Sequence, residues 1–570
     1  MDVQNCYLKR RILQPRYISG GFNLKKFLFT LAFWGLLTTG ADSSAAAQDY
    51  YIYNLKGRQI LYLKDGADTF AKGPKMTRKP DLVLRTGSGG FLVVLPPETG
   101  ADNSIPGHLA LYNAKGKRIH RIDLGYPPFR WAVTQDRRHF FIAYKSSLTQ
   151  EGFVLMHYDT EKMTAEKLLN YTQVYDLKLS WDEKLLLSLV KGQEQPQLTV
   201  LGYSPWKVRS TLVEHSHPQA IYPLTAETVA TVSFDNRSTR ELKRQPRAKG
   251  SVRLINITAN TVLAQAELPV APVYSRYYWK NNTLLVICGG WHETFFGIGG
   301  YGDVFKVTPS GISYFALKTG WTDFTYLPEK DTLYFLALGP FGEDQLSILQ
   351  LEDATTDHVP TGPNIYQTLA SPYKYHFPYS FFHVPDADYL IAACPQNGDI
   401  RFFNLSANLL QEAGERQGFR PWWSSPDIFP DPGAIVSANA DCTKFYVLNY
   451  VHNEIAVYDP ALQNSKIIPL KEPILGMYHI RQPKPQTLVA GINHLYRFDQ
   501  NKESLQRIAK FKNKARRIKL YQDGHRIILR TDQELLVLNL ATLKVKQRFI
   551  LNKGRGQQVR QRYCFLEPVE

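Results

Sequence analysis

Short apolar stretches of roughly five to seven residues recur along the chain, each bounded by Gly, Asp, Asn or Pro. Near the C-terminus one group occupies residues 526–530, 534–540 and 546–551, and a similar group begins at residues 139–144. Stretches of this length between turn residues are typical of β-strands. Few segments show the 3.6-residue apolar period of a helix, and only residues 406–417 read as a short helix. The pattern therefore predicts an all-β protein.

The strand groups repeat at intervals of about 40–50 residues, which is the length of a four-stranded β-propeller blade. A single four-stranded sheet cannot bury both of its faces, so such units must stack on neighbours. We expect residues 48–553 to form the repeat region, with about ten units between Asp81 and Lys553. They would form one large ring or two rings, because rings of about four to eight blades are the common ones. A β-sandwich array is the competing all-β architecture, but its strands would lack this long interval.

Two segments lie outside the ten units. Residues 49–55 and 59–64 predict a hairpin before the first unit, and residues 561–566 predict a strand in the tail 554–570. Pairing of this tail strand with the hairpin would close a ring.

One unit carries a resemblance to a known family. Residues 444–450 read Lys-Phe-Tyr-Val-Leu-Asn-Tyr, and residues 453–459 read Asn-Glu-Ile-Ala-Val-Tyr-Asp. This unit resembles the YVTN-type, WD40-like repeats of bacterial β-propellers, in which Tyr-Val-Thr-Asn precedes a turn and a strand ending in Asp. Leu448 stands where those repeats have Thr. The resemblance implies a propeller fold and export, and it implies no catalytic residue because the repeat is structural.

The N-terminal region predicts a secretory leader. Lys25 and Lys26 precede an apolar run at residues 27–37, and three alanines at 45–47 follow it. A charged start, a short apolar core and a small-residue exit define a signal peptide. The run is shorter than the roughly 20 residues of a spanning helix. We expect residues 1–47 to be removed during export to the periplasm, cell surface or medium, which leaves a mature chain without a transmembrane segment.

The charge favours an anionic partner. Six basic and two acidic residues would leave with the leader, which reduces the formal net charge from +17 to +13. On an exported protein such a charge points to an anionic envelope component rather than to nucleic acid. The loop 237–249 carries six basic residues and one acid, so it is either a solvated loop or a site for an anionic polymer. A second basic cluster, expected at a strand edge, comprises Lys512, Lys514, Arg516, Arg517 and Lys519.

Two aromatic segments, residues 373–383 and 419–432, precede consecutive predicted units. Aromatic rings stack on sugars and other flat ligands, and an Arg among them suits a recognition surface. We expect both segments at one mouth of the ring, while packing between blades is the alternative. The glycine-rich residues 297–302 precede a strand and not a helix, so they predict a loop rather than a dinucleotide site. The predicted ligand-binding residues are Trp422, Trp423, Arg420, Tyr375, Trp291 and His292.

His215 and His217 form the one His-x-His of the chain. On a strand this spacing would place both imidazoles on one face, where they could bind zinc or copper. In a connection between units they would be exposed polar residues.

The sequence shows no haem, P-loop or Gly-x-Ser-x-Gly motif, so no cofactor is expected. Cys288 and Cys394 lie in apolar stretches and are expected to be buried thiols.

These features indicate a ligand- or protein-binding scaffold at the bacterial cell envelope, with a glycan, a protein or another envelope component as partner. The alternative is a propeller enzyme, a hydrolase, lactonase or lyase acting on sugars at the channel mouth. An enzyme would need convergent carboxylates, His or Arg with strongly shifted pKa values. The sequence does not decide between the two.

Overall fold

The chain divides into two compact units, residues 1–46 and 47–570. The computed structural model describes residues of the second unit, from Tyr50 to Leu566. The predicted leader therefore lies outside the described residues. Also outside are residues 64–66, 68, 97, 100–103, 106, 125–129, 146–151, 193–194, 203–205, 216, 236–248, 270–272, 289–302, 317–319, 339–342, 352–368, 375–379, 385–388, 395–398, 405–410, 417–435, 440–442, 450–452, 460–463, 481–485, 523–525, 554–559, 562 and 567–570.

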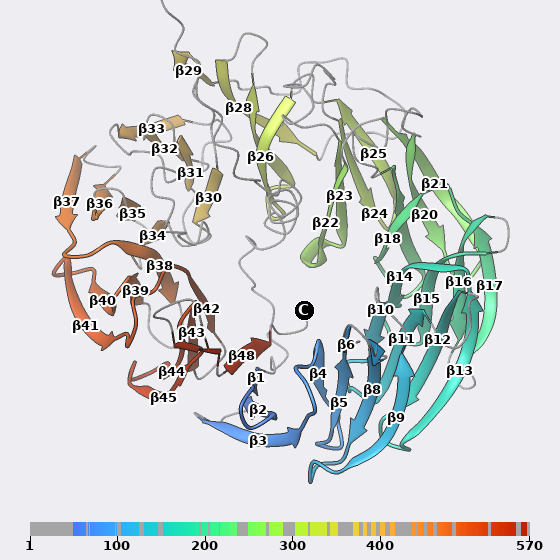
Figure 1. Cartoon of the computed structure of the whole chain (residues 1–570). Helices are drawn as coiled ribbons and strands as arrows, with labels where there is room; N and C mark the ends of the chain where they lie inside the picture. The colour runs from blue at the N-terminus through green and yellow to red at the C-terminus, as the bar shows by residue number, and fades with distance from the viewer. Residues whose placement is uncertain are drawn as a thin grey trace, which may run out of the picture. The chain divides into compact units, whose positions relative to one another are not determined.

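The described residues form eleven four-stranded antiparallel sheets, here called blades 1 to 11, and two short strand pairs (Figure 1). Blade 1 contains β48 (Tyr563–Leu566), β1 (Tyr51–Asn54), β2 (Gln59–Leu63) and β3 (Phe70–Lys75). Blade 2 contains β4 (Leu82–Arg85), β5 (Phe91–Leu95), β8 (Gly107–Tyr112) and β9 (Arg118–Leu124). The short pairs are β6 (Glu98–Thr99) with β7 (Ser104–Ile105), and β46 (Asn552–Lys553) with β47 (Arg560–Gln561).

Blades 3 to 6 follow in strict chain order. Blade 3 contains β10 (Arg130–Val133), β11 (His139–Lys145), β12 (Phe153–Asp159) and β13 (Thr164–Tyr171). Blade 4 contains β14 (Gln173–Leu179), β15 (Leu185–Lys191), β16 (Pro196–Gly202) and β17 (Lys207–Val213). Blade 5 contains β18 (Pro218–Pro223), β19 (Thr228–Ser233), β20 (Gly250–Asn256) and β21 (Thr261–Leu268). Blade 6 contains β22 (Val273–Tyr278), β23 (Thr283–Cys288), β24 (Asp303–Thr308) and β25 (Gly311–Ala316).

Blades 7 to 11 continue the same order. Blade 7 contains β26 (Gly320–Leu327), β27 (Thr332–Leu338), β28 (Glu343–Gln350) and β29 (Leu369–Lys374). Blade 8 contains β30 (Ser380–Val384), β31 (Tyr389–Cys394), β32 (Asp399–Asn404) and β33 (Gln411–Arg416). Blade 9 contains β34 (Val436–Ala438), β35 (Phe445–Asn449), β36 (Glu454–Asp459) and β37 (Asn464–Pro469). Blade 10 contains β38 (Ile474–Ile480), β39 (Gln486–Gly491), β40 (His494–Asp499) and β41 (Ser504–Lys510), and blade 11 contains β42 (Ile518–Gln522), β43 (Arg526–Thr531), β44 (Glu534–Asn539) and β45 (Val545–Ile550).

Burial along the strands explains the apolar pattern of the sequence. The second and third strands of a blade, such as β11 and β12, are buried over nearly their whole length. The fourth strands, such as β17, are largely exposed. Neighbouring blades cover both faces of the middle strands, which are therefore apolar without alternation, whereas the fourth strand lies at the outer edge (Figure 1).

The blades form one closed series. Apolar clusters join successive blades, as where Phe140 of β11 packs with Leu92 of β5, and direct contacts link β26 to β30 and β30 to β34. The last blade meets the first through Val537 of β44 and Ile52 of β1. The predicted all-β propeller with four-stranded blades is thereby confirmed, with eleven blades in a single series.

A repeated turn joins the third strand of a blade to the fourth. In blade 3, Oδ1 of Asp159 accepts the backbone N–H groups of Glu161 at 3.0 Å and Lys162 at 2.9 Å. Met163 then adopts a positive φ of 58°. Asn256 and Asp499 make the same turn in blades 5 and 10. An Asp or Asn at the end of the third strand caps the turn because its side chain replaces a backbone acceptor.

The short helix expected at residues 406–417 is wrong. Residues Gln411–Arg416 form β33, which pairs with β32 as the fourth strand of blade 8. The Gln, Glu and Ala residues there favour a helix locally, but the ladder of hydrogen bonds along β32 overrides this weak propensity. Among the described residues the one helical turn is η2 (Trp279–Asn281).

Candidate functional site

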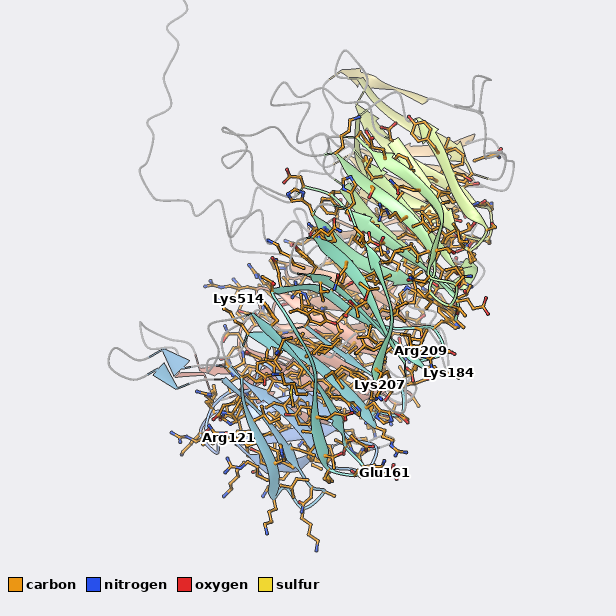
Figure 2. The ribbon with its side chains drawn as sticks, turned by 90° about the vertical axis from the view of Figure 1, so that its right-hand side faces the viewer. Arg121, Glu161, Lys184, Lys207, Arg209 and Lys514 are labelled. Atoms are coloured by element: carbon orange, nitrogen blue, oxygen red, sulfur yellow. The ribbon has the colours of Figure 1, made fainter. Side chains whose placement is uncertain are left out.

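Each blade presents two rims. The connections from the first to the second strand and from the third to the fourth leave on one side, here called the turn rim. The connections from the second to the third strand and from one blade to the next leave on the other side, here called the loop rim. In Figure 2, Glu161 and Lys184 of the turn rim lie on the opposite side of the sheets from Lys514 of the loop rim. Long connections at 234–249, 289–302 and 417–435 join strand ends at the loop rim, whereas that at 351–368 belongs to the turn rim.

His215 and His217 lie in the connection between β17 and β18, not on a strand. His217 has a positive φ of 62°, and its carbonyl accepts the N–H of Phe234 at 3.0 Å. The one-face arrangement of a strand therefore does not apply to this pair. The described part of the chain contains no group of three or more His, Cys, Asp or Glu side chains that could hold a metal ion.

The other predicted site residues, Trp291, His292, Tyr375, Arg420, Trp422 and Trp423, lie outside the described residues. The strands that flank them are described. Tyr375 falls between β29 and β30, residues 420–423 fall between β33 and β34, and residues 291–292 fall between β23 and β24. All of these strand ends belong to the loop rim, as do those that flank His215. The basic segment 237–249 lies between β19 and β20 on the same rim, and all of it but Lys249 is also outside the description.

The second basic cluster lies on the loop rim between β41 and β42. Residues 511–517, here called the basic loop, read Phe-Lys-Asn-Lys-Ala-Arg-Arg. Lys512, Lys514, Arg516 and Arg517 are exposed, while Phe511 and Ala515 are buried. The strand-edge prediction holds for Lys519, which lies on β42, and for Arg517, which forms a β-bridge directly before it, and is wrong for Lys512, Lys514 and Arg516. The loop forms because its two apolar residues pack into the core between blades 10 and 11.

Next to the basic loop a buried carboxylate collects three donors. Glu472, which is 8% exposed, accepts the N–H of Asn493 at 2.7 Å, Nδ1–H of His494 at 2.8 Å and the hydroxyl of Tyr496 at 2.5 Å. Burial and the bond to Glu472 raise the pKa of the Tyr496 hydroxyl above its usual value. The carbonyl of Asn493 accepts the N–H of Phe511 at 2.7 Å, which ties this cluster to the basic loop. Sequence reasoning missed the cluster because more than twenty residues separate Glu472 from its partners.

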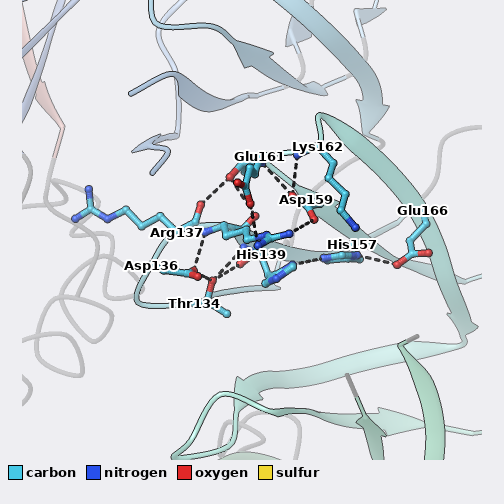
Figure 3. Close-up of polar contacts among 11 residues, drawn as sticks. Thr134, Asp136, Arg137, His139, His157, Asp159, Glu161, Lys162 and Glu166 are labelled. Carbon is cyan, nitrogen blue, oxygen red and sulfur yellow. Dashed lines mark hydrogen bonds and ion pairs between the residues drawn. The ribbon is translucent and has the colours of Figure 1, made fainter. Parts of the chain in front are cut away.

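A second polar chain crosses blade 3 (Figure 3). His139 Nδ1 lies 2.9 Å from His157 Nε2, and His157 Nδ1 lies 2.8 Å from Oε1 of Glu166. Burial is the main cause that lowers the pKa of both histidines, which are therefore neutral at pH 7. A carboxylate oxygen accepts, so Nδ1 of His157 donates to Glu166, and Nδ1 of His139 then donates to Nε2 of His157. Trp206 of the next blade packs against both rings.

Buried ion pairs connect successive blades. Oε2 of the fully buried Glu534 lies 3.1 Å from Nη1 of Arg548. Nη2 of the same arginine donates to the carbonyl of Lys510 on the preceding blade at 2.9 Å. Arg253 does the same beside Glu214, with its donation to the Val213 carbonyl at 2.7 Å. Burial, opposed by the arginine, raises the pKa of both carboxyl groups. Each arginine thus neutralises a buried carboxylate and also bonds to the backbone of the preceding blade, although Oε2 of both glutamates accepts no hydrogen bond from a described residue.

Two smaller findings complete the description. Cys288 is a buried thiol that takes part in no disulfide within the described residues, and burial raises its pKa. The side chain of Cys394 lies outside the description. No described helix is both long and apolar enough to span a bilayer.

The similarity of this chain to known proteins is confined to solved structures. No protein-family model matches it, and no curated protein matches it. It is similar to the β-propeller domain of the Trilobed protease from Pyrococcus furiosus, with 10% identity, coverage of 60% of this chain and 96% of the other, and a TM-score of 0.29. The β-propeller domain of Cps50 (Swd1) from Myceliophteria thermophila gives 10% identity, coverages of 58% and 98%, and a TM-score of 0.27.

A third similar structure is the dihydro-heme d1 dehydrogenase NirN in complex with DHE. It is 11% identical over 86% of this chain and 78% of the other, with a TM-score of 0.31. The fold assignment itself rests on the strand pairing within the blades.

Proposed function

We propose that this chain is an exported β-propeller that binds a ligand or a protein and serves as a scaffold at the bacterial cell envelope. The observation that carries the proposal is that buried ionisable groups of the propeller contact one another. Several buried ionisable groups of the described residues contact other side chains of the propeller. Glu534 forms an ion pair with Arg548, and His157 bonds to His139 and Glu166. Groups engaged in this way stabilise a rigid support, and the rims then remain as surfaces for recognition.

The loop rim is the better candidate for the recognition surface. Most long connections leave from it, and loops on a rigid scaffold commonly carry function. The aromatic and basic residues predicted from the sequence, Arg420, Trp422 and Trp423 among them, fall between strand ends of this rim. Stacking of aromatic rings on sugars makes an envelope glycan the favoured ligand class.

Export is the second part of the proposal. It rests on the leader-like residues 1–47 and on the YVTN-type resemblance of residues 444–459. The formal charge of +13 after removal of the leader suits an environment rich in anionic polymers. The enzyme alternative, a sugar hydrolase, lactonase or lyase, would place convergent acids and bases at the channel mouth.

The test is binding of the purified chain to a panel of envelope glycans, with Trp422→Ala and Trp423→Ala made singly. A recognition role predicts weaker binding and a stability change within about 0.5 kcal/mol. Packing between blades instead predicts a loss of about 3–5 kcal/mol of stability. Large stability losses in both variants, with no glycan bound by the parent chain, would refute the proposed surface.

A further inference from the structure

The basic loop concentrates positive charge without acidic neighbours in its own sequence. Four of its seven residues, Lys512, Lys514, Arg516 and Arg517, are basic, and none is acidic. All four are exposed. Within the described residues Lys512, Lys514 and Arg516 form no ion pair with an acid, although many other cations of the chain do.

The nearby acids hold the backbone of the loop. Glu534 accepts the N–H of Lys512 at 2.6 Å, and Asp532 accepts the N–H of Arg516 at 2.8 Å. The N–H of Ala515 donates to the carbonyl of Ile492 at 2.8 Å. The loop is thus fixed along its length, and a ligand would not have to order it on binding.

The same rim carries further basic positions beside blade 11. Lys519 of β42 stands opposite Arg530 of β43 in the strand register, and Lys553 of β46 stands opposite Arg560 of β47. The basic loop before blade 11 and Lys519 at the start of that blade therefore lie together at the loop rim.

We propose that the basic loop docks a linear polyanion whose charges are phosphodiester groups. Successive cations at 512, 514 and 516 are two residues apart, at most about 7 Å along an extended chain, so they can contact successive charges of one polymer. The guanidinium of Arg516 matches the oxygens of a phosphate in a bidentate manner. A lipid surface fits less well, because Phe511, the one large apolar residue of the loop, is buried in the core and only 3% exposed.

The inference rests on the proposed function only for the source of the polymer, the cell envelope. The test uses the purified full chain and polyglycerol phosphate as the probe, with affinity measured over a series of salt concentrations. The variant is Lys512→Ala with Lys514→Ala and Arg516→Ala. The matched control is Lys115→Ala with Lys117→Ala and Arg118→Ala, which removes three exposed charges from the turn rim between β8 and β9.

We expect the loop variant to bind at least tenfold more weakly, and the slope of log affinity against log salt to decrease by about two to three. The control should lose less than twofold, and both should keep the melting temperature of the parent. If the loop variant melts lower, Lys514→Glu alone replaces it, with Lys117→Glu as its control.

Equal losses in the two variants would overturn the inference, because charge alone would then explain binding. So would an absence of binding by the parent, or tighter binding to phosphatidylglycerol vesicles than to the polymer. None of these outcomes would contradict export, which the mass of the native protein decides independently.

Discussion

Tyr51, at the start of β1, faces Leu566, at the end of β48, across an antiparallel strand pair. The two ends of the described chain therefore complete one sheet, and blade 1 exists only when both are present. Ile52 of β1 is fully buried in the cluster that joins blade 1 to blade 11. The four residues of β48 supply the fourth strand of blade 1 and cover the free edge of β1.

Truncation after Gln561 removes β48, and we expect it to lower the melting temperature and to promote self-association. The reason is that β1 becomes an unpaired edge strand beside an exposed apolar cluster. Thermal unfolding and light scattering would measure both effects. Truncation after Leu566 is the matched control, since it leaves β48 intact and should melt like the parent. Identical melting of both truncations would contradict the closure.

The buried pair Glu534–Arg548 predicts a clear asymmetry between single and double substitution. Glu534→Ala should cost about 3 kcal/mol of unfolding free energy or more, because it leaves Arg548 without its buried carboxylate. Glu534→Met combined with Arg548→Met should cost less than the single change. Urea denaturation provides the values.

An exposed ion pair serves as the control for this series. Nη2 of Arg121 lies 2.7 Å from Oδ1 of Asp123, but the two side chains are 40% and 48% exposed. Asp123→Ala should therefore cost at most about 1 kcal/mol. Similar costs for the two pairs would argue against a structural role for Glu534.

Three buried histidines predict a loss of stability in acid. Burial, with neighbouring arginines, lowers the pKa of His108 to about 4, and burial also lowers the pKa values of His139 and His157. The unfolded value is about 6.5. Between these values only the unfolded chain binds the proton, so the unfolding free energy decreases as the pH falls.

His108 alone should contribute about 1.4 kcal/mol per pH unit between pH 6.5 and 4. Urea denaturation at pH 8, 7, 6 and 5 would show the slope, and His108→Gln should flatten it. A stability that rises on acidification over this interval would show that the buried histidines are charged in the folded chain.

The sequence predicts the middle strands of the blades well, because burial on both faces makes them continuous apolar runs. The runs at residues 526–530 and 534–540 correspond to β43 and β44 in this way. First strands such as β10 and β42 are short and mixed in polarity, so the sequence does not predict them one by one. The blades are indicated instead by the spacing of about 40–50 residues between strand groups. β33 was mistaken for a helix because pairing with β32 outweighs its local propensity.

The candidate site is less accessible to sequence reasoning. The basic loop is a local run of charge and is visible in the sequence. The Glu472 cluster is not visible in the sequence. His494 and Tyr496 lie on β40, and they contact Glu472 only after blade 10 has folded. The two-rim topology likewise appears only once the strand order is known, and it shows that the strand ends flanking the predicted aromatic and basic segments lie on one side.

The central claim, that this propeller is exported and acts at the envelope, is tested most directly by the mass of the native protein in fractions of its host cells. The account predicts a chain that begins at Gln48 and is recovered from the envelope or the medium. A chain that retains residues 1–47 and is recovered as soluble cytoplasmic protein would contradict it.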